Sequence, residues 1–315
     1  MKVSIILLAY NQKSYLRQAI DSVLIQQVEF DYELIIGEDC STDGTADIAR
    51  DYAQRYPDKV RVLFQDRETA ERLRRRGLGG KRNFITTLEA CRGEYIALLD
   101  GDDYWTDPLK LQKQVDFFEK HPECAVCFHN VVAVDEDGKP TEKLCAVDQA
   151  EISDFEQLLW GNFIPTCSVM FRREPMPTIP DWFLTSKIGD WPLILLKAQY
   201  GKIGYIDRVM AAYRVHASGV WTSRRRSHRI VTCIKMLDNI DRDFHFKYSS
   251  TIRQAKTRFF FELAELYLQI GHSRNARIPV KHGLRTSRGG HKGIVSLWLR
   301  LHAPRLYRVF KRGGR

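Results

Sequence analysis

The 315-residue sequence lacks several features that would have placed it outside the ordinary globular proteins. No stretch approaches about 18 consecutive apolar residues, the length that a membrane-spanning helix requires. The first ten residues lack the apolar core length and the cleavage site of a secretory signal peptide. The seven cysteines are odd in number and scattered, which does not suit a disulfide framework. We therefore expect a soluble cytoplasmic protein.

Two common nucleotide-binding motifs are also missing. The chain contains neither the G-x-G-x-x-G fingerprint of dinucleotide-binding folds nor a P-loop. Hydrophobic residues make up 44% of the chain, which excludes wholesale disorder and fibrous repeats. A chain of this length and composition can bury a large core, either as one large α/β domain or as two average ones.

Acidic residues are scarce in the last third of the sequence. Residues 222–315 contain 22 Lys and Arg against five Asp and Glu, whereas residues 1–221 carry a net charge of −7. This asymmetry predicts two regions: an acidic domain over 1–221 that suits metal or polyphosphate chemistry, and a basic, mainly helical region over 222–315. The basic region should contact something anionic, and a membrane surface is favoured over nucleic acid because no nucleic-acid-binding motif accompanies the charge.

Strand-like and helical segments alternate over the first 120 residues. Short apolar runs over 3–8, 33–37, 60–64 and 95–99 predict strands, with helices between them. This order is typical of βαβ units and predicts an α/β fold with a mostly parallel sheet flanked by helices. Residues 66–83 are charged and glycine-rich, and we interpret them as a basic loop that contacts a phosphate or, alternatively, as a solvated surface loop.

Polar and acidic residues follow three of these strands. Tyr10 follows the first strand, Glu38 and Asp39 the second, and the run Asp100–Asp103 the fourth. In such sheets the ligand lies at the carboxyl ends of the strands, so these groups should converge at one edge. Clustered carboxylates suit Mn²⁺ or Mg²⁺, which in turn can bind a diphosphate, although Asp and Gly are also common in tight turns.

These segments together resemble the family 2 glycosyltransferases. The resemblance rests on Leu8–Asn11, Gly37–Thr45, Lys81–Asn83 and Gly93–Asp103, in that order and spacing, over residues 1–220. It implies a GT-A fold, a nucleotide-sugar donor, a divalent metal ion and transfer with inversion.

The resemblance also implies a role for each matching residue. Asp102 would be the direct metal ligand of an Asp-x-Asp motif, and Asp103 would face the donor sugar or support the turn. Glu38 lies where the family more often has Asp. The residues expected at the nucleotide are Ala9, Tyr10, Glu38, Asp39, Lys81, Arg82 and Asp100, and those expected at the metal are Asp102, Asp100 and His216.

Two later motifs complete the expected site. Gly189-Asp190 resembles the family's acidic pair with Gly189 in place of the first acid, and Asp190 would be the general base. The alternative is that Asp190 caps a helix. His216, in a motif after a strand, would complete the metal shell or contact the diphosphate.

The expected function is that of an inverting glycosyltransferase. The donor would be a UDP-sugar by default, and the acceptor a hydroxyl of a glycan or lipid-linked saccharide in capsule or lipopolysaccharide synthesis, with the basic region on the inner membrane surface. One alternative is a sugar-nucleotide or nucleotidyl transferase, whose usual glycine-rich basic first loop is missing after Leu8. Another is a non-catalytic protein that binds anionic surfaces, against which the pairing of Asp100 and Asp102 with Asp190 argues.

Overall fold

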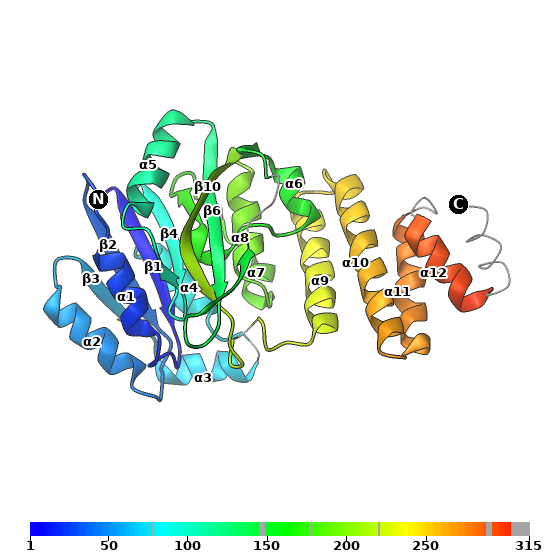
Figure 1. The fold of residues 1–315 in the computed structure, drawn as a ribbon, viewed down its shortest axis with the longest axis horizontal. Helices are drawn as coiled ribbons and strands as arrows, with labels where there is room; N and C mark the ends of the chain where they lie inside the picture. Colours follow the sequence, from blue (N-terminus) through cyan, green and yellow to red (C-terminus); the bar gives the residue numbers. More distant parts are fainter. Residues whose placement is uncertain (77, 145–148, 177, 220, 288–291, 304–315) are drawn as a thin grey trace. The chain divides into compact units, whose positions relative to one another are not determined.

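The computed structural model describes residues 1–76, 78–144, 149–176, 178–219, 221–287 and 292–303 (Figure 1). The chain divides into two compact units. The first comprises Met1–Leu158 and Asn162–Gly219, and the second comprises Leu159–Gly161 and Val220–Arg315. The division after Gly219 lies close to the change in charge at residue 221.

A mixed β-sheet forms the centre of the first unit, with its strands in the order β3-β2-β1-β4-β9-β6-β10-β5. Strand β7 pairs with β6, and β8 pairs with β10. The strands are β1 (Val3–Ala9), β2 (Tyr32–Glu38), β3 (Val60–Phe64), β4 (Tyr95–Asp100), β5 (Tyr104–Trp105), β6 (Cys124–Val134), β7 (Pro140–Leu144), β8 (Ile152–Ser153), β9 (Met170–Arg172) and β10 (Lys202–Arg214).

The predicted parallel half of the sheet is confirmed. Strands β1, β2, β3 and β4 are parallel neighbours, so the carboxyl ends of β1, β2 and β4 meet at one edge. The short strand β9 lies antiparallel between β4 and β6, and this makes the whole sheet mixed. Strand β10 again runs parallel to β6, over almost its whole length.

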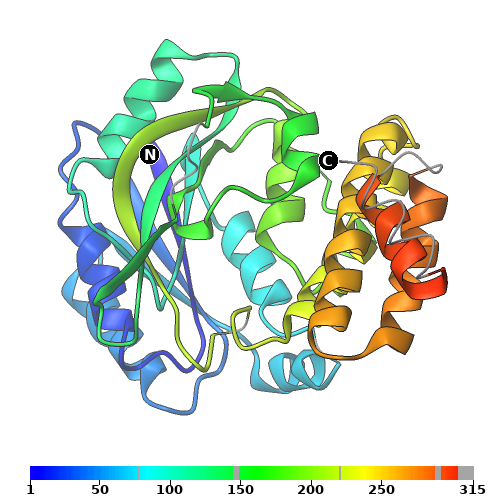
Figure 2. The same ribbon diagram turned by 45° about the vertical axis from the view of Figure 1, so that its right-hand side comes forward.

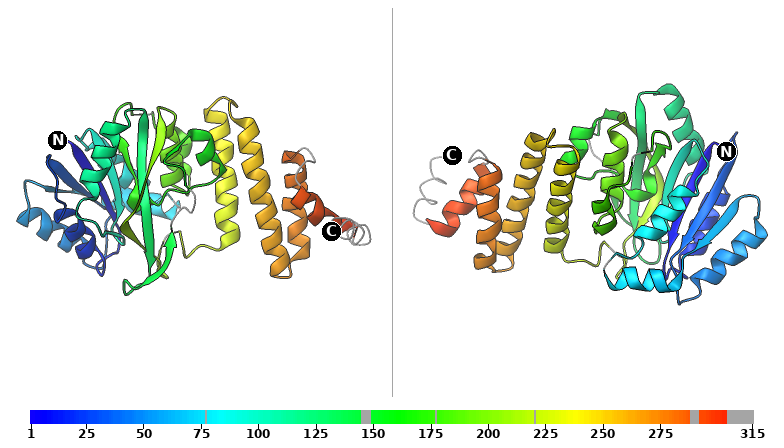
Figure 3. Two further views of the ribbon diagram at one scale, coloured as in Figure 1. Left: turned by 45° about the horizontal axis from the view of Figure 1, so that its top comes forward. Right: turned by 180° about the vertical axis from the view of Figure 1, so that it is seen from behind.

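Helices cover both faces of the parallel half (Figures 1 and 3). The side chains of β2 alternate, and Leu34 and Ile36 join the core that α1 and α2 complete. Gly37 faces α4 instead, where an added Cβ would lie 2.4 Å from Thr87 Oγ1. The helices of this unit are α1 (Leu16–Leu24), α2 (Thr45–Arg55), α3 (Arg67–Arg75), α4 (Lys81–Glu89), α5 (Lys110–Lys120), α7 (Asp181–Thr185) and α8 (Asp190–Ala198), with the 3₁₀ turn η1 (Thr166–Ser168). Helix α6 (Phe155–Trp160) ends where the chain first passes to the other unit.

The segment 66–83 differs from the loop expected from the sequence. Its first part forms helix α3, because Asp66 caps the helix by accepting a 2.8 Å hydrogen bond from the backbone N–H of Thr69. Gly80, at a φ of +80°, then turns the chain into α4. The high charge of this segment hid a helix whose Arg, Glu and Leu residues all have good helix propensity.

The second unit is helical. It contains α9 (Arg226–Asp243), α10 (Ser249–Gln269), α11 (Ser273–Thr286) and α12 (Lys292–His302). Helix α10 packs against both α9 and α11, and α12 packs against α11 (Figures 2 and 3). Ala264, Val280, Ile294 and Leu297 form a small apolar core shared by α10, α11 and α12.

Within the described ranges, no helix combines the length and the apolar character needed to cross a bilayer.

Candidate functional site

The site lies at the edge where β1, β2 and β4 end. Ala9 and Glu38 are opposite each other in the last pair of the β1–β2 register, and Asp39 N–H donates to the Ala9 carbonyl at 3.0 Å. The turn after β4 is bound to the same edge, because Gly101 N–H donates to the Leu8 carbonyl at 2.9 Å. A Cβ at Gly101 would lie 2.4 Å from Gln12 Oε1 and 3.1 Å from the Leu8 carbonyl oxygen, so a larger residue would displace the Gln12 side chain and crowd this edge.

Tyr10 and Asp39 form the part of the site expected to bind a nucleoside. The Tyr10 side chain is 39% exposed, and the guanidinium carbon of Arg74 lies 4.1 Å from the centre of its ring. Arg74 also donates to the backbone carbonyl of Asp39 at 2.7 Å and pairs with its carboxylate at 3.4 Å. Burial raises the pKa of Asp39, and Arg74 opposes that increase. Arg74 was not identified from the sequence, because its contacts with Tyr10 and Asp39 depend on helix α3, which the sequence did not predict.

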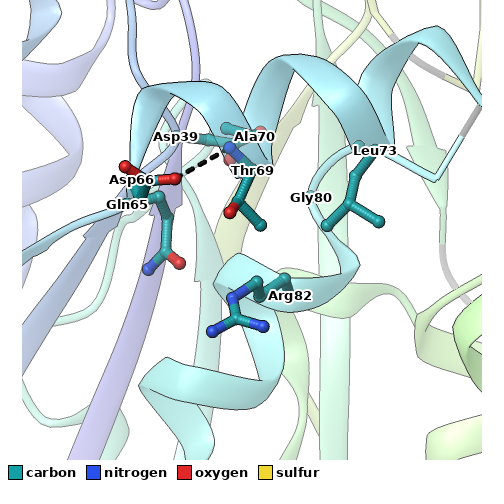
Figure 4. Close-up of a pocket in the computed structure, with 9 residues that line it drawn as sticks. Asp39, Gln65, Asp66, Thr69, Ala70, Leu73, Gly80 and Arg82 are labelled. Carbon is teal, nitrogen blue, oxygen red and sulfur yellow. Dashed lines mark hydrogen bonds between the residues drawn. The ribbon is translucent and has the colours of Figure 1, made fainter.

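Arg82 lies next to this region. Its side chain is exposed and lines a small cavity beneath α3, of about 10 Å³, which is room for one water molecule (Figure 4). The lining residues are Asp39, Gln65, Asp66, Thr69, Ala70, Leu73, Gly79, Gly80 and Arg82.

Glu38 is part of the loop that carries Asp39. It is only 2% exposed, and its two carboxylate oxygens accept hydrogen bonds from the backbone N–H groups of Cys40 and Ser41, at 3.0 and 2.8 Å. These bonds stabilise the turn after β2, in which Cys40 adopts a φ of +60°. The placement gives the Glu38 carboxylate a role in shaping the loop around Asp39.

Lys81 connects α4 with the segment that leads into α8. Its ammonium group donates to the Ile188 carbonyl at 2.7 Å and lies 4.5 Å from the centre of the Phe183 ring. Its Nζ would also be 3.1 Å from a Cβ added at Gly189. Lys81 therefore brings a positive charge next to the start of α8, where Asp190 lies.

Three carboxylates follow β4, and their surroundings differ. Burial, together with repulsion from Asp102 and Asp190, raises the pKa of the Asp100 carboxyl. Asp102 is partly exposed, and its Oδ2 lies 2.9 Å from His216 Nε2. Asp103 is 2% exposed and accepts a 2.9 Å hydrogen bond from the backbone N–H of Arg214. Of its two expected roles, this placement favours support of the turn over contact with a donor sugar.

The end of β10 binds the carboxylate turn through Arg214. This guanidinium is buried, at 4% exposed, and it donates to the backbone carbonyl of Asp102 at 2.9 Å and to that of Glu136 at 2.8 Å. It also lies 4.6 Å from the centre of the Tyr15 ring. Arg214 was not identified from the sequence, although it stands in the same motif as His216. The guanidinium group has several N–H donors in a fixed plane, so it can hold more than one backbone carbonyl in place.

His216 is the partner of Asp102. Its Nδ1 lies 2.8 Å from Ser218 Oγ, and its hydrogen bond to Asp102 is the main cause of a raised pKa. The two side chains thus come together from β4 and from the loop after β10, separated by more than one hundred residues.

Asp190 is the first residue of α8 and lies in its first turn. The N-cap position is Gly189, without a side-chain capping bond. The Asp190 carboxylate instead accepts hydrogen bonds from Asn162 Nδ2 at 3.0 Å and Thr166 Oγ1 at 3.3 Å. Thr166 belongs to η1, which packs against β4, so the Asp190 carboxylate lies on the side of the sheet where β4 and Asp100 are found. Asn162 was not identified from the sequence, because no motif marks it.

The donor atoms present fit a cation that shares its coordination with a substrate. In the described part of the chain, no group of three or more His, Cys, Asp or Glu side chains could hold a metal ion alone. Asp102 and His216 offer one carboxylate oxygen and one imidazole nitrogen. Mg²⁺ is usually bound through one or two carboxylates together with substrate phosphates and water, and imidazole also suits transition metals.

Comparison with known proteins shows the family. The model for glycosyl transferase family 2 matches residues 4–176. The protein Rv1520 of Mycobacterium tuberculosis (strain ATCC 25618 / H37Rv) is 41% identical over 227 residues, or 72% of this chain. The chain spans 62% of the length of that relative. The putative teichuronic acid biosynthesis glycosyltransferase TuaG of Bacillus subtilis is 31% identical over 68% of this chain and 79% of its own.

Solved structures show the same fold at low sequence identity. TarS of S. aureus (residues 1–349, in complex with UDP-GlcNAc) is 14% identical with a TM-score of 0.58, over 99% of this chain and 92% of that one. The mannosyltransferase PcManGT of Pyrobaculum calidifontis, in complex with GDP-Man and Mn²⁺, is 16% identical with a TM-score of 0.55, over 99% and 82%. The α/β fold with a mixed sheet and a helical C-terminal region is therefore that of GT-A glycosyltransferases, and the chain belongs to glycosyl transferase family 2.

Proposed function

We propose that this chain is an inverting glycosyltransferase that uses a nucleoside-diphosphate sugar, with Asp190 as the general base. The acceptor is a hydroxyl of a glycan or lipid-linked saccharide in cell-surface polysaccharide synthesis, as the name of TuaG suggests for that relative. The observation that carries the proposal is the position of Asp190. Its carboxylate is oriented by Asn162 and by Thr166, and Thr166 lies in η1, which packs against β4.

The donor is held at the edge of the sheet. The nucleoside base stacks on Tyr10, and its N–H groups donate to Asp39, which the loop stabilised by Glu38 and the end of β1 at Ala9 keep in position. A UDP-sugar is the default donor, and TarS provides a structural neighbour with UDP-GlcNAc.

Positive charge is available for the departing diphosphate. Arg82 is exposed near the nucleoside part of the site, and Lys81 lies at the start of the same helix. Asp102 and His216, with Asp100 beside them, would hold a Mn²⁺ or Mg²⁺ ion, which supplies further positive charge to the diphosphate. PcManGT, whose structure contains Mn²⁺, is a neighbour with the same fold.

The reaction is a single displacement. Asp190 takes the proton of the acceptor hydroxyl as that oxygen bonds to the anomeric carbon, and the bond from this carbon to the diphosphate oxygen breaks. The general base contributes about 10²–10⁴ in rate. The bonds from Asn162 and Thr166 keep the carboxylate in one orientation before the acceptor binds, which reduces the reorganisation required.

Calorimetric titration with UDP, GDP and dTDP, with and without Mn²⁺, tests the proposal. We expect one nucleotide to bind the native protein in a metal-dependent way, and this binding to be lost in Asp102→Ala. The control is Asp107→Ala, which removes a carboxylate that pairs with Lys113, away from the Asp102–His216 pair. If no nucleotide binds under either condition, the proposed transferase function is wrong.

A further inference from the structure

The last two helices, α11 and α12, contain basic side chains and no acidic ones. After Glu265 the sequence contains no Asp or Glu, and residues 271–315 include 12 Lys and Arg. In helix α11 four of these side chains, at spacings of three or four residues, are exposed along one face: Arg274, Arg277, Lys281 and Arg285. The opposite face, with Ala276, Val280 and Gly283, is buried. The basic face is therefore free of acidic neighbours in its own helix and in α12.

Two exposed apolar side chains lie within this basic surface. Ile278 of α11 is 65% exposed, and Trp298 of α12 is 39% exposed. Both line a groove of about 360 Å³ between the two helices. The groove is lined by Arg277, Ile278, Lys281, Leu284, Trp298 and His302. Trp298 stacks on His302, with 5.4 Å between the ring centres, so the indole has a defined orientation.

We propose that this α11–α12 surface, composed of Arg274, Arg277, Ile278, Lys281, Arg285 and Trp298, docks the protein on an anionic phospholipid bilayer. The basic side chains contact lipid phosphates, and Ile278 and Trp298 enter the boundary between headgroups and acyl chains. This inference deepens the proposed function, because it rests on the acceptor being lipid-linked. It identifies which part of the basic region meets the membrane.

The exposed apolar side chains distinguish a bilayer from a nucleic acid. Phosphate contacts alone would account for the arginines and lysines. They would not favour an isoleucine whose side chain is mostly exposed beside the basic residues of the same helix. A bilayer offers both an anionic surface and an apolar layer directly below it, and a tryptophan is a side chain suited to that boundary.

Vesicle flotation tests the inference on the full chain. We expect the protein to float with vesicles of phosphatidylcholine and phosphatidylglycerol, and to bind phosphatidylcholine vesicles much more weakly. The double substitution Arg277→Gln with Lys281→Gln should lower the partition coefficient about 30-fold, at about fivefold to sixfold for each basic residue near the surface. Ile278→Ser leaves the charge unchanged and should lower it about tenfold, because an exposed isoleucine loses its apolar contact with the acyl chains.

A matched variant separates the surface from the overall charge. Lys235→Gln with Lys247→Gln removes the same two charges at exposed positions in and after α9. We expect this control to bind vesicles like the native protein. If the control loses as much binding as the α11 double substitution, the docking surface is wrong and net charge alone explains the effect.

Two further binding results would overturn the proposed docking on an anionic bilayer. Equal binding to both kinds of vesicle, or to neither, overturns the proposal, and so does short duplex DNA binding to the protein that vesicles do not displace. All of these measurements are made without donor. Calorimetry with the nucleotides on the same variants reports the proposed transferase function separately, so a failure of one leaves the other measurable.

Discussion

At the scale of single residues, the acidic side chains that the sequence groups together have different surroundings. Glu38 accepts two backbone N–H groups of its own loop, and Asp103 accepts the backbone N–H of Arg214. Asp102 pairs with His216, whereas Asp190 is held by two neutral side chains. The contacts of Asp190 fix the orientation of its carboxylate, which is what the proposed role as general base requires.

Replacing Asp190 tests this assignment directly. We expect Asp190→Asn to lower kcat for sugar transfer by about 10²–10⁴, because the amide cannot take the acceptor proton. Nucleotide affinity should change little, since Asp190 does not contact the nucleoside part of the site. Steady-state kinetics with calorimetry on the same sample checks both points. Asp181→Asn, at an exposed position at the start of α7, is the control and should behave like the native protein.

A buried lysine away from the sheet edge predicts a pH-dependent stability. Lys110 is 0% exposed, and none of the described residues forms a hydrogen bond with its Nζ, which lies 3.8 Å from the centre of the Trp105 ring. Burial lowers the pKa of Lys110 to about 7, from an ordinary value of 10.5. Between these two pH values the unfolded chain binds a proton here that the folded chain does not, so stability rises with pH across this window.

Lys110→Met removes this cost. We expect the variant to raise the free energy of unfolding by about 1–3 kcal/mol near neutral pH, and by less near pH 10, because the folded lysine is neutral there and the unfolded one, close to its ordinary pKa of 10.5, has begun to lose its proton. Urea unfolding at the two pH values measures the difference. Lys120→Met, exposed at the end of the same helix, should change stability little at either pH. A lower stability of Lys110→Met at neutral pH would contradict the argument.

At the scale of elements, helix α3 completes the part of the site where we propose that the nucleoside binds. It begins at the Asp66 cap and brings Arg74 against Tyr10 and Asp39. Burial and Arg74 act in opposite directions on the pKa of Asp39. The helix thus offsets part of the effect of burial on the pKa of this carboxyl.

Removing the Arg74 charge should therefore shift the pH dependence of nucleotide binding. In Arg74→Gln the pKa of Asp39 rises further, so the carboxylate that accepts the N–H of the base is lost at a higher pH. As the pH decreases from about 8 to about 5, we expect the nucleotide affinity of the variant to fall at a higher pH than that of the native protein. Carboxyl groups with a raised pKa titrate in this range. Calorimetry across this range checks the shift. Arg75→Gln, on the same helix and with an 82% exposed side chain, should leave the profile unchanged.

At the scale of the whole molecule, the two units have separate cores and opposite charge. The first unit is organised around the sheet, and the second around the contacts of α10, α11 and α12. Because the candidate site belongs to the first unit, a bound nucleotide stabilises that unit by mass action.

Hydrogen exchange should show this division. We expect a nucleotide with Mn²⁺ to slow amide exchange in β1, β2 and β4 and in the turns that follow them, and to leave α10 and α11 almost unchanged. Ligand at about 100 times its Kd corresponds to about 2.7 kcal/mol of added protection against global unfolding of the unit. Equal slowing in α10 and α11 would show that the two units open together, contrary to this prediction. Asp102→Ala with the same ligands provides the baseline.

The sequence by itself determined the features that depend on neighbouring residues. The apolar runs and helical spacings predicted β1 to β4 and the parallel half of the sheet, because each element is formed by a continuous segment. The family and the carboxylate run after β4 were also readable, since their motifs are contiguous.

Tertiary structure alone decided which groups meet across long chain separations. Strand β9, only three residues long, enters the sheet between β4 and β6, and no local pattern predicts that pairing. The contacts of Arg74 with Tyr10, of Arg214 with the turn after β4, and of Asn162 with Asp190 likewise join distant segments. A side chain's charge and type are local properties, but its partners and its burial depend on packing, and these set its pKa and its chemistry.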